Sequence, residues 1–133
     1  MNADSNTDIV KQSYAAFFQG DMDAMLALYS EDVDWEVYGP SSIPTTGLHR
    51  GKDGVRAFFG KVDDLLENES FEVQEHVAQG DTVVVLGEYS WRSKVTERVV
   101  HAHFAHVVTV TDGKITRFRE YTDTAALVEA MVA

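Results

Sequence analysis

A glutamate and a histidine near the end of the sequence have the spacing of an acid–base pair. Asp112-Gly113 predicts a two-residue hairpin turn between two strands, residues 98–111 and 114–122. Counting outward from this turn places His103 diagonally across from Glu120 on one face of the sheet. A carboxylate and an imidazole at that separation can share or relay a proton near neutral pH. We therefore predict that Glu120 is a catalytic residue that moves a proton and that His103 tunes or relays it.

Other interpretations of this pair stay open. A His–Glu hydrogen bond can simply satisfy two polar groups under a sheet. His101, His103 and Glu120 together could form a site of two histidines and one carboxylate for iron or another metal. A slip of one residue in the turn would put His103 and Glu120 on opposite faces. We expect chemistry that needs no metal or other cofactor.

Composition limits the classes of protein and partner. The 133 residues predict a single domain, 1–133. Cysteine is absent, which excludes disulfides, cysteine zinc sites and thiol catalysis. Eleven basic and 22 acidic residues give a net charge of −11, a field that repels nucleic acid and anionic lipid. We expect a cytoplasmic protein that binds neither nucleic acid nor membranes.

Hydrophobic periodicity changes along the chain from helical to extended. Asp8, Asp21, Asp53 and Asp123 stand where they can cap four helices, and Gly20 stands where the first helix can end. The second helix is expected to bury Met25, Leu28 and Tyr29, and a loop is expected over residues 39–51. Period-2 alternation predicts five strands: 32–38, 71–78, 82–92, 98–111 and 114–122.

This order predicts an α+β fold in which helices pack on one face of a strongly curved, mainly antiparallel sheet. Such an arrangement is a cone-shaped α+β barrel that encloses an apolar cavity. A carboxylate in an apolar cavity is poorly solvated, which raises its pKa toward the range that a general acid or base requires. Aromatic walls suit a planar hydrophobic ligand. From the helices and the first strand, the expected ligand-binding residues are Tyr14, Trp35, Val37 and Phe58.

Several segments resemble the nuclear transport factor 2-like superfamily, and more narrowly its SnoaL-like polyketide cyclase and ketosteroid isomerase-related group. The resemblance covers nearly the whole chain and is carried by residues 14–17 before Gly20-Asp21, 28–33, 49–59, 112–115 and 117–127. It implies the cone-shaped fold. It also implies one of several activities, because the superfamily includes isomerases, cyclases, epoxide hydrolases, dehydratases and non-catalytic binding modules.

Comparison with the site residues of two known enzyme classes of the superfamily narrows the range of expected activities. The general base of the steroid isomerases falls on Val37 and their oxyanion-hole acid on Ala105; their tyrosine donor falls on Ser13, one position from Tyr14. The Asp-Arg-Asp group of limonene-type epoxide hydrolases falls on three further positions: Tyr89, Gly87 and Glu120. Both chemistries are disfavoured, and only the position of Glu120 carries over.

The same resemblance assigns the faces of the last two strands. It places Glu120 and Ala105 at pocket positions, so the remaining expected ligand-binding residues are His101, Ala105, Val107 and Phe118. It implies a homodimer contact through the convex face, and the apolar Phe104, Val108 and Val110 expected there are consistent with this contact. The same assignment places His106 on the convex face. We expect a cofactor-free enzyme that cyclises, isomerises or dehydrates a hydrophobic carbonyl compound such as a polyketide or steroid-like molecule. The alternative is a non-catalytic small-molecule-binding or accessory domain that uses the same cavity.

Overall fold

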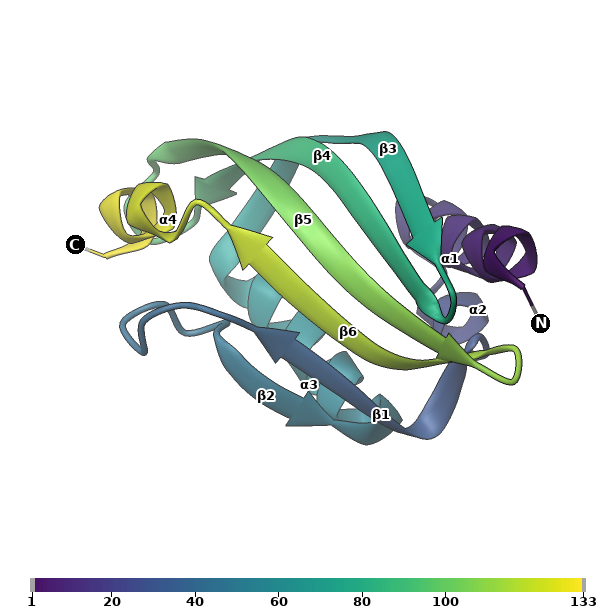
Figure 1. Cartoon of the computed structure of the whole chain (residues 1–133). Coiled ribbons are helices and arrows are strands. Elements are labelled where there is room, and N and C mark those ends of the chain that lie inside the picture. Colours follow the sequence, from purple (N-terminus) through teal and green to yellow (C-terminus); the bar gives the residue numbers. More distant parts are fainter. Residues whose placement is uncertain (1, 133) are drawn as a thin grey trace.

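A strongly curved six-stranded sheet lies in front of three helices, and a fourth helix closes one end (Figure 1). The computed structural model describes residues 2–132. The strand order is β2-β1-β6-β5-β4-β3, and every pair of neighbours is antiparallel except β1 and β6. The elements are α1 Ala3–Phe18, α2 Met22–Leu26, β1 Tyr29–Val37, β2 Gly47–Arg50, α3 Gly51–Leu65, β3 Leu66–Gln79, β4 Thr82–Ser93, β5 Val99–Thr111, β6 Lys114–Thr122 and α4 Thr124–Met131.

Side chains cap three of the helices. Asp21 and Asp123 accept hydrogen bonds from the backbone at the starts of α2 and α4, as predicted. The first helix begins earlier than predicted, because Asn2 and Ser5 form a capping box ahead of Asp8. Asp53 is not a cap; it lies within the first turn of α3, which starts at Gly51. Across residues 2–132, no helix has the length and apolar character needed to span a membrane.

The first strand and its neighbour differ from the sequence expectation. The second helix ends at Leu26, so Tyr29 opens β1 instead of lying on a helix. The expected loop over residues 39–51 contains β2, which pairs with β1 so that Trp35 lies opposite His49. The residues of β2 form a short edge strand of mixed polarity. They lack the apolar alternation that identifies longer strands in a sequence.

The concave face of the sheet holds the core. On β5 the inward side chains are Val100, Ala102, Phe104, His106, Val108 and Val110, which are all buried. The expectation that Phe104, Val108 and Val110 lie on the convex face is therefore wrong. Helices α1 and α3 cover this face, with Val10 and Val55 fully buried between the layers.

One extra residue in β6 decides which side chains of β5 share a face with it. Thr111 lies opposite Lys114, as the hairpin turn predicts. Beyond Val110–Ile115 the register shifts, because no residue of β5 lies opposite Thr116 and the next opposed pair is Thr109–Arg117. The bulge places His106 opposite Glu120, where the uninterrupted register would have placed Ala105.

Candidate active site

Glu120, His106 and Tyr14 form a hydrogen-bonded chain on the concave face. The Glu120 Oε2 atom lies 2.7 Å from His106 Nε2, and the His106 Nδ1 atom lies 2.5 Å from the Tyr14 hydroxyl. A carboxylate only accepts hydrogen bonds, so His106 donates from Nε2 to Glu120, and in the tautomer protonated at Nε2 alone its Nδ1 atom accepts a hydrogen bond from the Tyr14 hydroxyl. The His106 side chain is 4 % exposed, and its ring stacks on Phe104. Its orientation is therefore fixed by both packing and hydrogen bonds.

The second oxygen of Glu120 is much less engaged. The nearest hydrogen-bond partner of Oε1 among the described residues is the Tyr89 hydroxyl, at 3.4 Å. That hydroxyl donates over a shorter distance, 2.8 Å, to the Thr122 hydroxyl. Thr122 in turn donates to the backbone carbonyl of His103, also at 2.8 Å. A contact of 3.4 Å is weak, so Oε1 is the carboxylate atom available to a ligand.

Three tyrosines beside this chain stay uncharged at neutral pH. Burial raises the pKa of Tyr14 well above its ordinary value, and nearby Tyr29 and Glu120 raise it further. Burial also raises the pKa of Tyr29. The pKa of Tyr89 is raised by burial first and then by the charge of Glu120. All three side chains therefore present neutral hydroxyl groups.

These groups border an apolar cavity of about 90 Å³ between the sheet and the helices. Trp35 and Phe118 form one wall, with ring centroids 3.7 Å apart and nearly parallel planes. The other lining residues are mostly aromatic or aliphatic: Tyr14, Phe17, Met25, Tyr29, Phe58, Phe59, Val62, Leu66, Phe71, Tyr89, Trp91, Val108, Ile115, Leu127 and Met131. Glu120 is the one carboxylate among the described lining residues.

The family model described as a SnoaL-like domain matches residues 10–118, which include most of the helices and strands that build this cavity. The chain belongs to the SnoaL-like family. The match covers Tyr14 and His106 and ends two residues before Glu120. Membership of this family agrees with the curved α+β architecture described above.

Similar proteins match nearly the whole length of this SnoaL-like chain. An uncharacterised protein of Mycobacterium tuberculosis is 31% identical over 127 residues, which cover 95% of each chain. A nuclear transport factor 2-like protein of Burkholderia xenovorans, known from its crystal structure, is 37% identical with a TM-score of 0.90, covering 98% of each chain. The protein TerC, co-crystallised with polyporic acid, is 28% identical with a TM-score of 0.87, covering 97% of this chain and 99% of TerC.

The structure of this SnoaL-like chain brings only part of the predicted site together. Tyr14, Trp35, Phe58, Phe118 and Glu120 all border the cavity. Val37 is buried, but it borders a separate depression beneath residues 38–47. The other four predicted residues, His101, His103, Ala105 and Val107, lie on the convex face, because the bulge at Thr116 reverses the face of β5 that matches Glu120.

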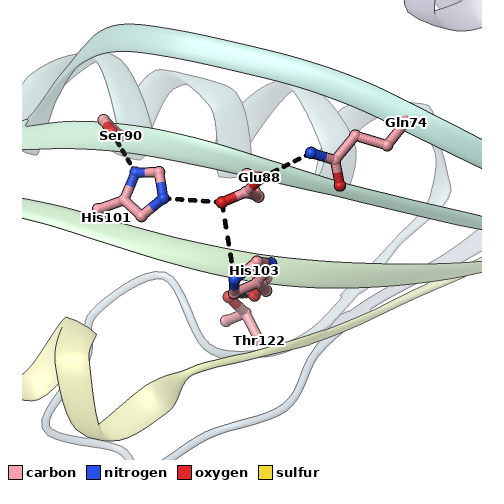
Figure 2. A network of polar contacts seen from close by, with 6 residues as sticks. All are labelled: Gln74, Glu88, Ser90, His101, His103 and Thr122. Atoms are coloured by element: carbon pink, nitrogen blue, oxygen red, sulfur yellow. Dashed lines mark hydrogen bonds and ion pairs between the residues drawn. The ribbon is translucent and has the colours of Figure 1, made fainter.

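The predicted pairing of His103 with Glu120 is therefore wrong, as is the outward orientation of His106. The His103 side chain is 79 % exposed, and its Nε2 atom lies 3.6 Å from Glu88 Oε1. Figure 2 shows this convex-face cluster, in which His101 Nε2 approaches the same Glu88 oxygen at 2.9 Å. His101 and His103 cannot share a metal ion with Glu120. Over residues 2–132, no group of three or more His, Asp or Glu side chains is arranged to hold a metal.

One pattern in the sequence identifies His106 as an inward residue. The even-numbered positions of β5 carry Val100, Ala102, Phe104, Val108 and Val110, whereas the odd-numbered positions include His101, His103 and Thr109. The more apolar set faces the core, so His106 is the single polar residue in an apolar row. A lone polar side chain at a core position needs hydrogen-bond partners, and it marks a candidate functional residue.

Proposed function

We propose that this SnoaL-like chain is an enzyme that performs acid–base chemistry on a small hydrophobic carbonyl compound. The observation that supports the proposal is the asymmetry of Glu120. Its Oε2 atom is held by His106 at 2.7 Å, while Oε1 has no partner closer than 3.4 Å among residues 2–132. A carboxylate fixed at one oxygen and available at the other can accept a proton in a defined direction.

The reaction begins at a carbon next to the carbonyl group of the ligand. Glu120 Oε1 takes a proton from that carbon, and the C–H electron pair forms a carbon–carbon double bond while negative charge moves to the carbonyl oxygen. The protonated Glu120 then returns the proton to another atom, which gives isomerisation or assists loss of water. Alternatively, the enolate carbon attacks a second carbonyl carbon of the same molecule, the π electron pair of that carbonyl moves to its oxygen, and this oxygen takes the proton from Glu120, which gives a cyclised hydroxyketone. Every group that moves a proton in these steps belongs to the chain or the ligand.

His106 and Tyr14 position Glu120 rather than touch the reacting atoms. The His106 N–H holds Oε2, and the Tyr14 hydroxyl fixes the tautomer by donating to Nδ1. This hydrogen-bonded chain lies in apolar surroundings, where hydrogen bonds to charged groups are stronger than in water. It stabilises the carboxylate orientation that the first step requires.

The cavity volume limits the size of the ligand. About 90 Å³ is well below the roughly 300–1,000 Å³ of sites that hold drug-sized molecules. A compact single-ring ligand needs less movement of the cavity walls than a polycyclic one. The similarity to TerC, crystallised with polyporic acid, supports ligand binding in this branch of the family.

Removal of a proton from a simple ketone tests the proposal without the natural substrate. The probe is cyclohex-3-en-1-one in D₂O, whose hydrogens between the carbonyl and the double bond are acidic, and NMR follows their replacement by deuterium. We expect the protein to accelerate this exchange and Glu120→Gln to lose at least a hundredfold of the acceleration. Glu88→Gln is the matched control, because Glu88 pairs with His101 on the convex face, away from the cavity. We expect this variant to retain the acceleration.

A second function, ligand binding without catalysis, is supported by the same hydrogen-bonded chain, because Glu120 already has a strong partner in His106. The ketone experiment separates the two functions. If the ketone binds in the cavity and its exchange is no faster than in buffer, the enzyme proposal fails and the binding domain remains.

A further inference from the structure

The Thr122 side chain lies two residues beyond Glu120 on β6 and on the same face of the sheet. Its position opposite the inward-facing Phe104 of β5 agrees with this placement. The Thr122 hydroxyl accepts a hydrogen bond from the Tyr89 hydroxyl at 2.8 Å and donates to the backbone carbonyl of His103 at 2.8 Å. Thr122 therefore links the hydroxyl group nearest to Glu120 Oε1 with the backbone of β5.

The two hydrogen bonds of Thr122 run in one direction. A hydroxyl group has one proton to donate and lone pairs that accept. The carbonyl of His103 can only accept, so it takes the Thr122 proton, and Thr122 Oγ1 is left to accept the Tyr89 proton. The β-branched side chain of Thr122 has few rotamers, which keeps Oγ1 in this position. The single hydroxyl proton of Tyr89 is thereby directed to Thr122 and away from Glu120 Oε1, which lies 3.4 Å from the Tyr89 oxygen.

The Tyr89 ring is fixed within reach of both acceptors. Tyr89 is 4 % exposed, and its ring stacks on Phe104 with centroids 5.1 Å apart and packs against Phe71. A buried hydroxyl that loses its acceptor is unfavourable, and a charged carboxylate is a stronger acceptor than a hydroxyl group. Without Thr122 Oγ1, Glu120 Oε1 is the acceptor that remains beside Tyr89 among residues 2–132. We therefore expect that loss of the Thr122 hydroxyl turns the Tyr89 proton toward Glu120.

We propose that Thr122 is a positioning residue that keeps the Tyr89 hydroxyl off Glu120 Oε1 and so leaves this oxygen free to take a proton from the ligand. This inference rests on the proposed function, in which Oε1 is the base. A carboxylate oxygen that accepts a strong hydrogen bond is a weaker base, because that bond is lost when the oxygen takes a proton. His106 already holds Oε2, so a strong bond from Tyr89 would engage both oxygens of the carboxylate.

Variants at Thr122 test this role in the deuterium exchange of cyclohex-3-en-1-one. Thr122→Val removes the hydroxyl group with little change of shape, and we expect it to lose about tenfold or more of the acceleration, because Tyr89 then donates to Oε1. Thr122→Ala removes the same group with a smaller side chain and should give the same loss. Thr122→Ser keeps the hydroxyl group and should restore the rate. The matched control is the double variant Tyr89→Phe/Thr122→Val, which removes the competing donor and should recover most of the rate that Thr122→Val loses.

The hydroxyl proton of Tyr89 gives a second readout, which does not depend on catalysis. A phenol that donates to a carboxylate has a downfield, slowly exchanging proton resonance, so NMR should show a new resonance in Thr122→Val that is absent from the wild-type protein and from the double variant. The proposal is overturned if Thr122→Val keeps the wild-type rate, if Thr122→Ser does not restore it, or if the double variant stays as slow as Thr122→Val. If the wild-type protein does not accelerate the exchange, the proposed function fails, and the resonance alone decides whether Thr122 keeps Oε1 free for a bound ligand. Absence of the new resonance from Thr122→Val overturns the inference in either case.

Discussion

His106 holds one oxygen of the Glu120 carboxylate at 2.7 Å, and Thr116 makes this contact possible by adding one residue to β6. Opposed residues of two antiparallel strands point to the same side, so the extra residue brings the imidazole into the cavity with the carboxylate. The contact lies where both side chains are largely removed from water. A hydrogen bond to a charged group in such surroundings contributes to stability as well as to chemistry.

Replacement of His106 should therefore destabilise the fold. His106→Phe keeps a ring that can stack on Phe104 but leaves the Glu120 carboxylate without its short hydrogen bond. We expect a loss of about 2–4 kcal/mol in the free energy of unfolding at neutral pH, measured with urea. His103→Phe introduces the same substitution on the exposed face of the same strand and should change the free energy by less than about 0.5 kcal/mol. Equal losses in the two variants would contradict the buried role of His106.

The elements around this contact differ in how far the sequence predicts them. The caps at Asp21 and Asp123 and the turn at Asp112-Gly113 are local features, set by residues within one or two turns of chain, and they are predicted correctly. The bulge at Thr116 is different, because β6 is paired with both β5 and β1, and both ladders are irregular near Ile115. The position of the bulge depends on packing between distant segments, so the sequence of β6 alone does not determine it.

The extra residue at Thr116 explains why the predicted face of the sheet is correct for Glu120 and wrong for His103. The face of β6 is identified correctly, since Phe118 and Glu120 border the cavity. The face of β5 is inferred by counting through the hairpin, and one unpaired residue reverses it. The hydrophobic alternation of β5 is independent of that count and indicates the correct face, so it is the better guide beyond a turn.

Alkaline pH should destabilise the protein through its buried tyrosines. Burial raises the pKa of Tyr14, Tyr29 and Tyr89 in the folded state, while the unfolded chain keeps values near 10. The stability that these groups provide is therefore complete below about pH 10 and is lost as the pH rises further, because the unfolded state releases protons first. The urea concentration at the midpoint of unfolding should therefore decrease as the pH is raised from 9 to 11.

Absorbance near 295 nm measures this ionisation directly. Of the five tyrosines in the sequence, no more than two should ionise before the protein unfolds. Tyr29→Phe removes one buried phenol and should reduce the fall in unfolding midpoint between pH 9 and pH 11. Ionisation of all five tyrosines in the folded protein at pH 11 would show that water reaches the cavity hydroxyls.

Gly87 should not tolerate a side chain. A Cβ atom at this position would lie 2.2 Å from the backbone oxygen of Glu72 and 2.6 Å from the ring of Phe104. We expect Gly87→Ala to reduce the free energy of unfolding by about 2 kcal/mol or more, because both contacts are too close and one involves backbone. Gly60, within α3, has no atom within 4 Å of such a Cβ. Gly60→Ala should stabilise the protein by about 0.5–1 kcal/mol, and a similar effect of both substitutions would contradict the close packing at Gly87.

The convex face provides the last prediction, a homodimer formed by this side of the sheet. Its outward residues include Val77 and Tyr121, which are about half exposed, and Val107 near the middle of β5. Apolar side chains on an open sheet face are typical of a surface that a second copy covers. Sedimentation equilibrium at micromolar concentration should give twice the chain mass of 14.8 kDa. Val107→Arg should give a folded monomer, whereas Val95→Arg, in the turn between β4 and β5, should remain dimeric. A wild-type monomer at these concentrations would remove the prediction, and a dimeric Val107→Arg variant would move the interface to another surface.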